Sequence, residues 1–147
     1  MRQFVRFWKL PAAERCLLLS ALCHLVAVEA GLWALPLQQL LERLPQAAAA
    51  GGAGRAGNAP PAERIAWAVR VAGRYLPGAG NCLVQSLVAQ AMLARRGYVS
   101  RLRLGVAHGD GGQFQAHAWV ECDGQVIVGA EEVSRYAAFP PLEVGRR

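Results

Sequence analysis

The first third of the chain follows the periodicity of a helix. Residues 12–44 form the longest apolar stretch, and Pro36 is expected either to end a helix there or to begin a second one over 37–44. The apolar positions that share one helical face are Leu18, Ala21, Leu22 and Leu25. His24, Glu29 and Pro36 interrupt the run, which therefore falls short of the ~20 uninterrupted residues of a membrane span. The pattern favours an amphipathic helix that is buried or faces a partner, and peripheral contact with a membrane is the alternative.

The composition changes after residue 46. Residues 47–60 are mostly Ala and Gly and are expected to form a connecting segment. Pro60-Pro61 then precede a helix whose apolar face consists of Ile65, Ala68, Val69 and Ala72. We therefore divide the single predicted domain into an amino-terminal helical segment (1–46), a linker (47–60) and a core (61–147).

Another apolar helix is predicted to begin at Cys82. It follows the turn-forming residues 77–80 and should end near Arg95-Arg96-Gly97. Its apolar positions are Val84, Leu87, Val88 and Ala91. Cys82 would then lie in the first turn, where the helix dipole stabilises a thiolate. Asn81 is expected either to cap this helix or, with Gln85, to support an oxyanion site.

The periodicity then changes to the alternation of strands. In residues 99–106 the leucines share one face and the arginines the other, which predicts a half-buried strand. A loop over 108–112 leads to a second strand, 114–122, in which His117, Trp119 and Glu121 share one parity. Asp123-Gly124 is a strong hairpin signal, and a third strand should follow it. The carboxyl end, from residue 135, is expected to form a final edge segment that closes the core.

Cys82 and His117 together indicate nucleophilic catalysis. Only a thiolate attacks carbonyl groups well, and an imidazole that takes the thiol proton generates it. The competing interpretations are a buried structural cysteine and a core histidine. The arrangement predicts a cysteine hydrolase.

The order of these elements resembles the transglutaminase-like branch of the papain-like cysteine hydrolases, and within it the leader peptidases, or B proteins, of lasso peptide biosynthesis. The residues that carry the resemblance are 81–87, 95–98, 101–106, 116–121 with Asp123-Gly124, and the amino-terminal segment 7–15. The resemblance implies an α+β fold: a transglutaminase-like (papain-like) core with the cysteine at a helix start, packed on a small antiparallel sheet and preceded by a helical segment.

The resemblance also implies the reaction and the partners. A bacterial stand-alone leader peptidase cuts a ribosomally made precursor peptide between leader and core without a metal or another cofactor. The implied partners are the precursor peptide, a separate leader-recognition protein and an ATP-dependent macrolactam synthetase. We expect the leader-recognition protein to act in trans, since no such domain precedes the core.

The third catalytic residue is where the sequence departs from the family pattern. In the family an acid on the strand after the histidine orients the imidazole, and here that position falls near Gly129, which has no side chain. If Asp123-Gly124 forms a two-residue turn, His117 lies opposite Ala130. Asp123 is the nearest aspartate, and Glu131 is the alternative acid. Asp123 is equally well interpreted as a turn former.

The charge and the cysteines narrow the remaining possibilities. The net charge is +6, from 16 Lys and Arg against 10 Asp and Glu. The arginines are scattered and accompany no nucleic-acid motif, so we expect an acidic peptide partner, or solubility alone, and no nucleic acid. Basic residues ahead of Leu17-Leu18-Leu19 are also compatible with a signal peptide.

The four cysteines show neither a C-x-x-C pair nor the spacing of a metal site. Cys16 and Cys23 lie two helical turns apart, ~10.5 Å along the axis, which is too far for a disulfide. We expect both to be small core residues and the protein to work in a reducing cytoplasm.

Two other functions use the same features. A transglutaminase or amidase with the same Cys/His pair would act on glutamine side chains. A non-catalytic peptide-binding module of the same fold would explain the missing acid near Gly129.

Overall fold

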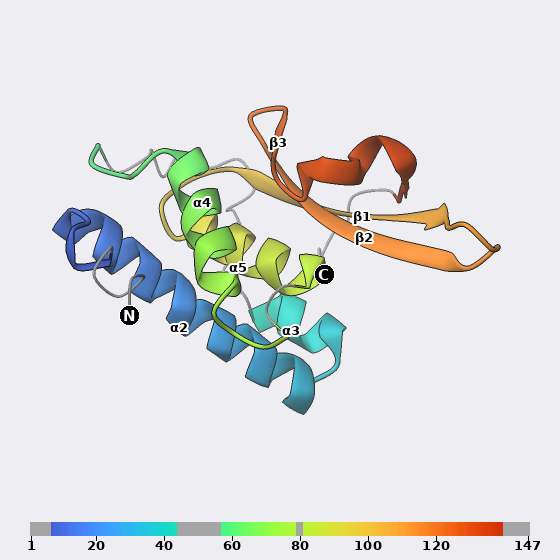
Figure 1. Cartoon of the computed structure of the whole chain (residues 1–147), viewed down its shortest axis with the longest axis horizontal. Coiled ribbons are helices and arrows are strands. Elements are labelled where there is room, and N and C mark those ends of the chain that lie inside the picture. The colour runs from blue at the N-terminus through green and yellow to red at the C-terminus, as the bar shows by residue number, and fades with distance from the viewer. Residues whose placement is uncertain (1–6, 44–56, 79–80, 140–147) are drawn as a thin grey trace.

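The computed structural model describes residues 7–43, 57–78 and 81–139 (Figure 1). Within these ranges the structure combines helices α2 to α5 with a small antiparallel sheet, against which α5 packs, and this is the α+β arrangement that the family resemblance implied. Residues 47–56 of the predicted linker lie outside them, so the division of the chain at that point stays a prediction.

The amino-terminal apolar stretch forms α2 (Ala12–Ala34), and α3 (Leu37–Arg43) follows it. The residue before Pro36 is extended, with φ −133° and ψ 145°. Proline disfavours helical backbone in the preceding residue and lacks an N–H for the helix, so α2 ends there. The carbonyl of Pro36 then accepts the N–H of Leu40 in α3 over 3.1 Å. Pro36 thus ends one helix and begins the next.

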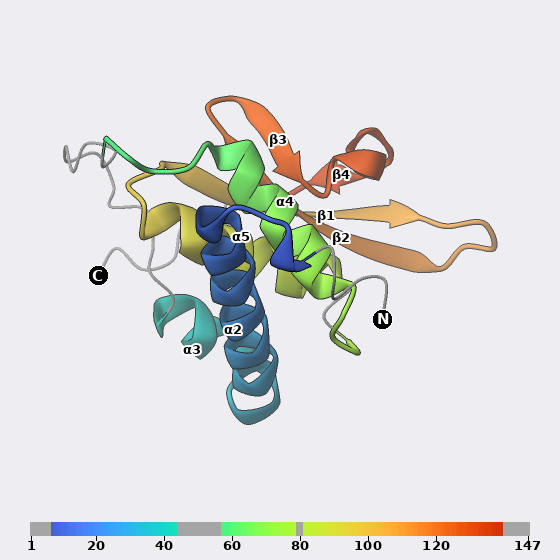
Figure 2. The ribbon, with the colours of Figure 1, turned by 60° about the vertical axis from the view of Figure 1, so that its left-hand side comes forward.

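The helical layer consists of α4 (Ala62–Gly73) and α5 (Cys82–Ala94), which pack on each other and on α2 (Figures 1 and 2). The face of α4 that the sequence predicted is buried: Ile65, Ala68, Val69 and Ala72. An ion pair between Arg64 and Glu14 joins α4 to α2. This packing holds the start of α5 beside the end of α4.

The carboxyl end of α5 follows the sequence signal closely. Gly97 has φ +79°, its N–H bonds to the carbonyl of Ala94 over 3.1 Å, and the N–H of Tyr98 bonds to that of Leu93 over 3.0 Å. These two bonds are a Schellman motif, in which glycine takes the left-handed position without the penalty of a Cβ. The chain turns back from there into the sheet.

The sheet has the strand order β3-β2-β1-β4. Its long hairpin pairs β1 (Ser100–His108) with β2 (Phe114–Cys122), from Ser100 opposite Cys122 to His108 opposite Phe114. β3 (Gln125–Val128) follows the turn at Asp123-Gly124, and the two turn residues have φ +51° and +79°, as a type I′ hairpin requires. β4 (Ala137–Ala138) pairs with β1 at the edge, as expected of the carboxyl end.

One face of the sheet packs on α5. Leu102 of β1, Ala118, Val120 and Cys122 of β2 and Val128 of β3 are buried with the apolar residues of α5. The alternate residues of β2, His117 and Trp119, belong to the other parity, as the sequence indicated. Successive side chains of a strand point to opposite faces, so the burial of Ala118 and Val120 against α5 directs His117 to the other face of β2.

The exposure of α2 corrects two predictions. Cys16 and Cys23 are exposed and not core residues, because they lie on the helix face opposite Leu17, Ala21 and Leu25. The helix is also not amphipathic in the ordinary sense, since the residues that it exposes are apolar. By length and composition α2 could cross a membrane, although a little over a quarter of its most apolar window is buried in the protein.

Candidate active site

Cys82 is the first residue of α5, and Asn81 caps the helix in front of it. Asn81 Oδ1 accepts the N–H of Leu83 over 2.9 Å, and the Asn81 carbonyl accepts the N–H of Gln85 over 3.1 Å. Asn81 therefore caps α5, and its support of an oxyanion stays a prediction. The N–H of Cys82 has no acceptor within the helix, because it belongs to the first turn. The positive end of the helix dipole is therefore directed to the region around the thiol.

His117 is held by a hydrogen bond from its ring to the backbone. Its Nε2 lies 2.8 Å from the carbonyl oxygen of Gly129. A carbonyl oxygen can only accept, so Nε2 carries the hydrogen, and in the neutral ring Nδ1 is then the acceptor. The ring thus presents a basic nitrogen on the side that does not face Gly129.

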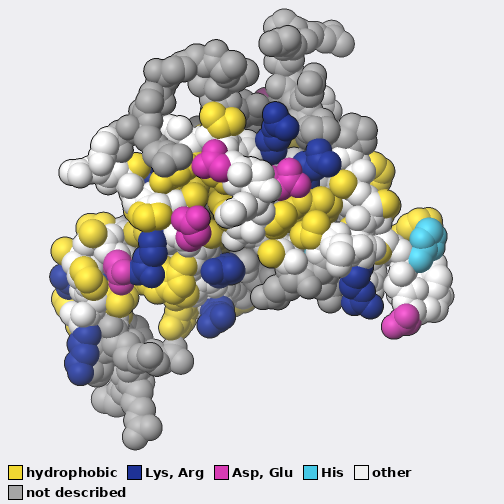
Figure 3. Space-filling view, turned by 90° about the horizontal axis from the view of Figure 1, so that it is seen from above, with side chains coloured by type: hydrophobic (Ala, Val, Ile, Leu, Met, Phe, Trp, Pro, Cys, Tyr) yellow, Lys and Arg dark blue, Asp and Glu magenta, His cyan; other side chains and the backbone are white. Residues whose placement is uncertain are grey.

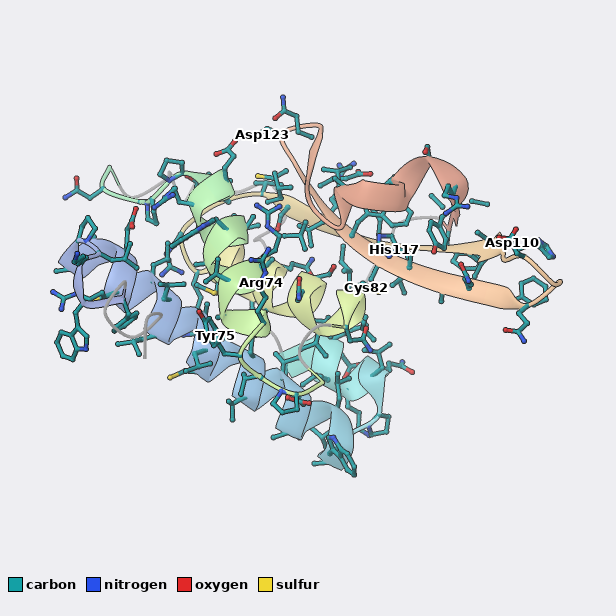
Figure 4. All side chains as sticks on the ribbon, viewed as in Figure 1. Arg74, Tyr75, Cys82, Asp110, His117 and Asp123 are labelled. Carbon is teal, nitrogen blue, oxygen red and sulfur yellow. The ribbon has the colours of Figure 1, made fainter. Side chains whose placement is uncertain are left out.

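A cavity of ≈ 440 Å³ brings the two residues together (Figure 4). It is lined by Cys82 and Gln85 of α5, His117 of β2, Arg70 and Gly73 of α4, Arg74 directly after α4, and residues 128–130 at the end of β3. In Figure 4 Cys82 lies at the start of α5, next to the strand that carries His117. Gln85 is one helical turn after Cys82 and so shares its face. Cys82, Gln85 and His117 therefore line one cavity, and their catalytic roles stay predictions.

The structure does not bring Asp123 to this cavity. Asp123 lies in the β2–β3 turn, with φ +51°, and Figure 4 shows it at the tip of the hairpin, away from His117. The Gly129 carbonyl, and not Asp123, bonds to the ring nitrogen that an orienting acid would meet. The side chain of Glu131, the alternative acid, is not among the described parts of the structure, so its role stays a prediction.

A β-bulge explains why counting the register from the turn failed. Glu121 pairs with Val126, but the next residue, Val120, pairs with Val128, so one residue of β3 is left over. The pairing ends there, and Ala130 begins the 3-10 helix η1 (Ala130–Arg135) instead of lying opposite His117. The shift leaves Gly129 beside Trp119 with its carbonyl toward the imidazole.

Two aromatic rings lie nearly parallel to the imidazole of His117. The Tyr136 ring is 5.0 Å away between centroids at 26°, and the Trp119 ring is 6.0 Å away at 23°. The Trp119 ring is held in place by its Nε1–H, which donates to the Glu121 carboxylate over 3.1 Å. Tyr136 was not predicted, because nothing in the sequence says that the segment after η1 folds back against His117.

Arg70 and Arg74 were also not predicted as site residues. They are one helical turn apart on α4, both are exposed, and both line the cavity that holds Cys82. The periodicity of α4 puts both arginines outside its apolar face, and this was the one sequence signal that could have drawn attention to them. Only the packing of α4 beside α5 brings them to the cavity. They give the cavity a positive wall. Elsewhere, on the face seen in Figure 3, basic and acidic side chains are interspersed.

A second cavity, of ≈ 220 Å³, lies where η1 meets the β1–β2 hairpin and includes His108, Asp110 and Arg135. No cysteine is among its lining residues, so the Cys/His combination belongs to the larger cavity. Among the described residues, no group of three or more His, Cys, Asp or Glu side chains is placed to hold a metal ion.

Comparison with known proteins identifies the fold. Residues 24–143 match the transglutaminase-like superfamily, and the chain belongs to that family. This is the fold of cysteine proteases and transglutaminases, and it supports a cysteine-protease-like function in general terms. No curated protein and no solved structure matched the chain.

Proposed function

We propose that this chain is a cysteine peptidase that removes the leader from a ribosomally synthesised lasso precursor peptide. Its nucleophile is Cys82 and its general base is His117. The observation that carries the proposal is the shared cavity, in which the Nε2–H bond to Gly129 leaves His117 Nδ1 as the proton acceptor. The resemblance of residues 81–87 and 116–121 to the lasso leader peptidases supports the choice of substrate.

The reaction is acyl transfer to water. His117 Nδ1 takes the proton of the Cys82 thiol, and Sγ forms a bond to the carbonyl carbon of the scissile peptide. The N–H of Cys82 stabilises the oxyanion at the helix start. Nδ1–H then protonates the leaving amine as the C–N bond breaks, which leaves a thioester. Water, deprotonated by Nδ1, attacks the thioester, releases the acid and returns the thiol.

The Gly129 carbonyl fixes the tautomer that this reaction needs. A neutral carbonyl orients the ring as an acid would, but it lacks the charge that an acid places beside the imidazolium. The parallel rings of Tyr136 and Trp119 restrict the imidazole further. Proton transfer requires Sγ and Nδ1 to come within hydrogen-bond distance in the substrate complex, as catalytic pairs do when substrate binds.

The positive wall of the cavity suits a peptide with acidic residues near the cut. Arg70 and Arg74 line the cavity that holds Cys82, and a guanidinium binds carboxylates with two parallel hydrogen bonds. The partners that we propose are the precursor peptide, a separate leader-recognition protein and the macrolactam synthetase that acts next. The site of action that we propose is the cytoplasm.

The test is cleavage of the precursor peptide encoded beside this gene, followed by mass spectrometry, with and without the neighbouring leader-binding protein. The full chain should cut once, between leader and core. Cys82→Ala should abolish the cut, and His117→Gln should slow it by roughly 10²- to 10⁴-fold. His108→Gln is the matched control, since His108 lines the other cavity, and it should cut at the wild-type rate.

Selective alkylation separates an inactive preparation from a wrong assignment. Cys16 and Cys23 are exposed in the single chain and lie on α2, not at the start of α5, so at protein concentrations well below micromolar they report on an accessible thiol without activation. At mildly acidic pH, iodoacetamide should modify Cys82 well before either of them. A glutamine-containing peptide that is deamidated or linked to an amine by Cys82, with the precursor left intact, would show an amidase or transglutaminase instead. Equal alkylation of Cys16, Cys23 and Cys82, with no cleavage, would exclude the enzyme and favour the non-catalytic binding module.

A further inference from the structure

α2 has a second apolar face, which points away from the protein. Leu19 and Val26 are each 51% exposed, and Trp33 is 89% exposed. Cys16, Cys23 and Ala30 are exposed as well. We call these residues the outer stripe: Cys16, Leu19, Cys23, Val26, Ala30 and Trp33. A helix that is apolar all round is ordinarily buried all round, and here the protein covers only the opposite face.

The outer stripe follows the period of a coiled coil. Its members are spaced by three and four residues alternately, which is a 3.5-residue repeat carried through the helix. A repeat of 3.5 keeps a narrow seam turned toward one partner helix along the whole length, whereas an interfacial helix covers a broad apolar face and borders it with Lys and Arg. No Lys or Arg of α2 is exposed beside the stripe; Arg15 is half-buried. The stripe therefore fits a second helix better than a lipid surface.

The sizes along the outer stripe indicate which helix. One heptad position holds the large residues Leu19, Val26 and Trp33, and the other holds the small residues Cys16, Cys23 and Ala30. In a parallel pair, like positions face each other, so large layers would alternate with layers of small residues that leave gaps. In an antiparallel pair of the same helix, each large residue faces a small one. Even layers of that kind pack to normal density.

We propose that the outer stripe of α2 binds the same stripe of a second copy of this chain, antiparallel, about a two-fold axis. The register with the most large-to-small pairs sets Leu19 against the partner's Ala30, Val26 against the partner's Cys23, and Trp33 against the partner's Cys16. Each pair occurs twice, as a two-fold interface requires. This inference does not depend on the proposed peptidase activity.

The shape of the molecule leaves the outer stripe accessible. In Figure 2 α2 stands in front of α4 and α5, and no described helix or strand covers its outer side. The helix is 23 residues long, or ~34 Å, which accommodates the three layers of each half. One helix pair buries less than a standard interface, so we expect a dimer with a dissociation constant on the order of micromolar.

The first test is sedimentation velocity of the full chain over ~1–100 µM, a range that spans such a constant. The wild type should shift from monomer to dimer with concentration. Val26→Glu should remain monomeric throughout, because it sets a charge in the centre of the seam of each copy. Val99→Glu is the matched control: Val99 is 60% exposed outside α2, so this variant should dimerise as the wild type does. Unchanged circular dichroism of both variants shows that the fold is intact.

The second test fixes the orientation by disulfide formation under mild oxidation. Val26→Cys should give a covalent dimer through Cys23 of the partner subunit, since the two Cα atoms would lie within the ~4.4–6.8 Å that a disulfide spans. Adding Cys23→Ser should abolish that dimer. A wild-type dimer linked through Cys16 to Cys16 of the partner subunit would overturn the antiparallel register, because in that register these two residues lie ~25 Å apart along the helices. A chain that stays monomeric at every concentration overturns the proposal. If that monomer binds phosphatidylglycerol vesicles and Val26→Glu does not, the outer stripe contacts a lipid surface instead.

Discussion

The imidazole of His117 donates its Nε2–H to the backbone carbonyl of Gly129 over 2.8 Å. A main-chain atom therefore stands where an orienting acid was expected. Gly129 can hold that position because it has φ +81° and lies directly against Trp119 and the Ala118 carbonyl, where a Cβ would approach to 2.7 Å. The missing side chain is thus required by the packing beside the histidine.

Gly129→Ala should damage both stability and the site. The left-handed backbone costs an alanine ~1–2 kcal/mol, and the clash with Ala118 and Trp119 adds roughly 1–3 kcal/mol. Gly124→Ala is the matched control, with φ +79° and nothing within 4 Å of the added Cβ. It should show only the first cost in a chemical denaturation curve. Well below the melting temperature, iodoacetamide should also modify Cys82 more slowly in Gly129→Ala than in the wild type, whereas Gly124→Ala should react at the wild-type rate. Equal rates in the two variants would contradict the role given to the Gly129 carbonyl.

Asp123→Asn should leave peptide cleavage unchanged. Asp123 occupies a positive-φ turn position that asparagine adopts equally well, and it lies away from His117. The measurement is kcat/KM on the precursor peptide beside the melting temperature. A fall in kcat/KM comparable to that of His117→Gln, with the melting temperature unchanged, would return Asp123 to the catalytic group.

Arg74→Gln should raise KM for peptides with acidic residues near the cut and leave kcat nearly unchanged, because we propose that this cavity-lining side chain binds substrate and takes no part in bond breaking. The effect should shrink as salt is raised from 0.05 to roughly 0.5 M, since screening weakens the same attraction in the wild type. Arg101→Gln is the matched control, an exposed arginine on β1 outside the cavity. Equal KM values for acidic and neutral peptides in the wild type would exclude this recognition.

Ser86→Ala should stabilise the fold. Ser86 is fully buried on α5, and its Oγ has no hydrogen-bond partner among the described residues. A buried hydroxyl without a partner costs ~1–3 kcal/mol, so removing it should increase the free energy of unfolding by ~1 kcal/mol. Ser86→Thr keeps the hydroxyl and adds a methyl group to a close-packed site, so it should destabilise instead. A loss of stability in Ser86→Ala would show that the hydroxyl has a partner in the native protein.

The sequence by itself determined the local elements of this protein. Asn81 before Cys82, the glycine after α5, Pro36 and Asp123-Gly124 all act through the backbone of their own neighbours, and the elements begin and end where these residues predict. Parity alone also put His117 and Trp119 together, because alternation in a strand depends only on the chain itself.

Only the tertiary structure decided what surrounds the thiol and the imidazole. The bulge that brings the Gly129 carbonyl to His117, the fold-back of Tyr136, and the packing that places Arg74 at the cavity of Cys82 each depend on contacts between segments far apart in the chain. The exposure of Cys23 has the same cause. Apolar residues occur on all sides of α2, and the packing of α4 and α5 determines which side is buried. Local periodicity carries no information about either choice.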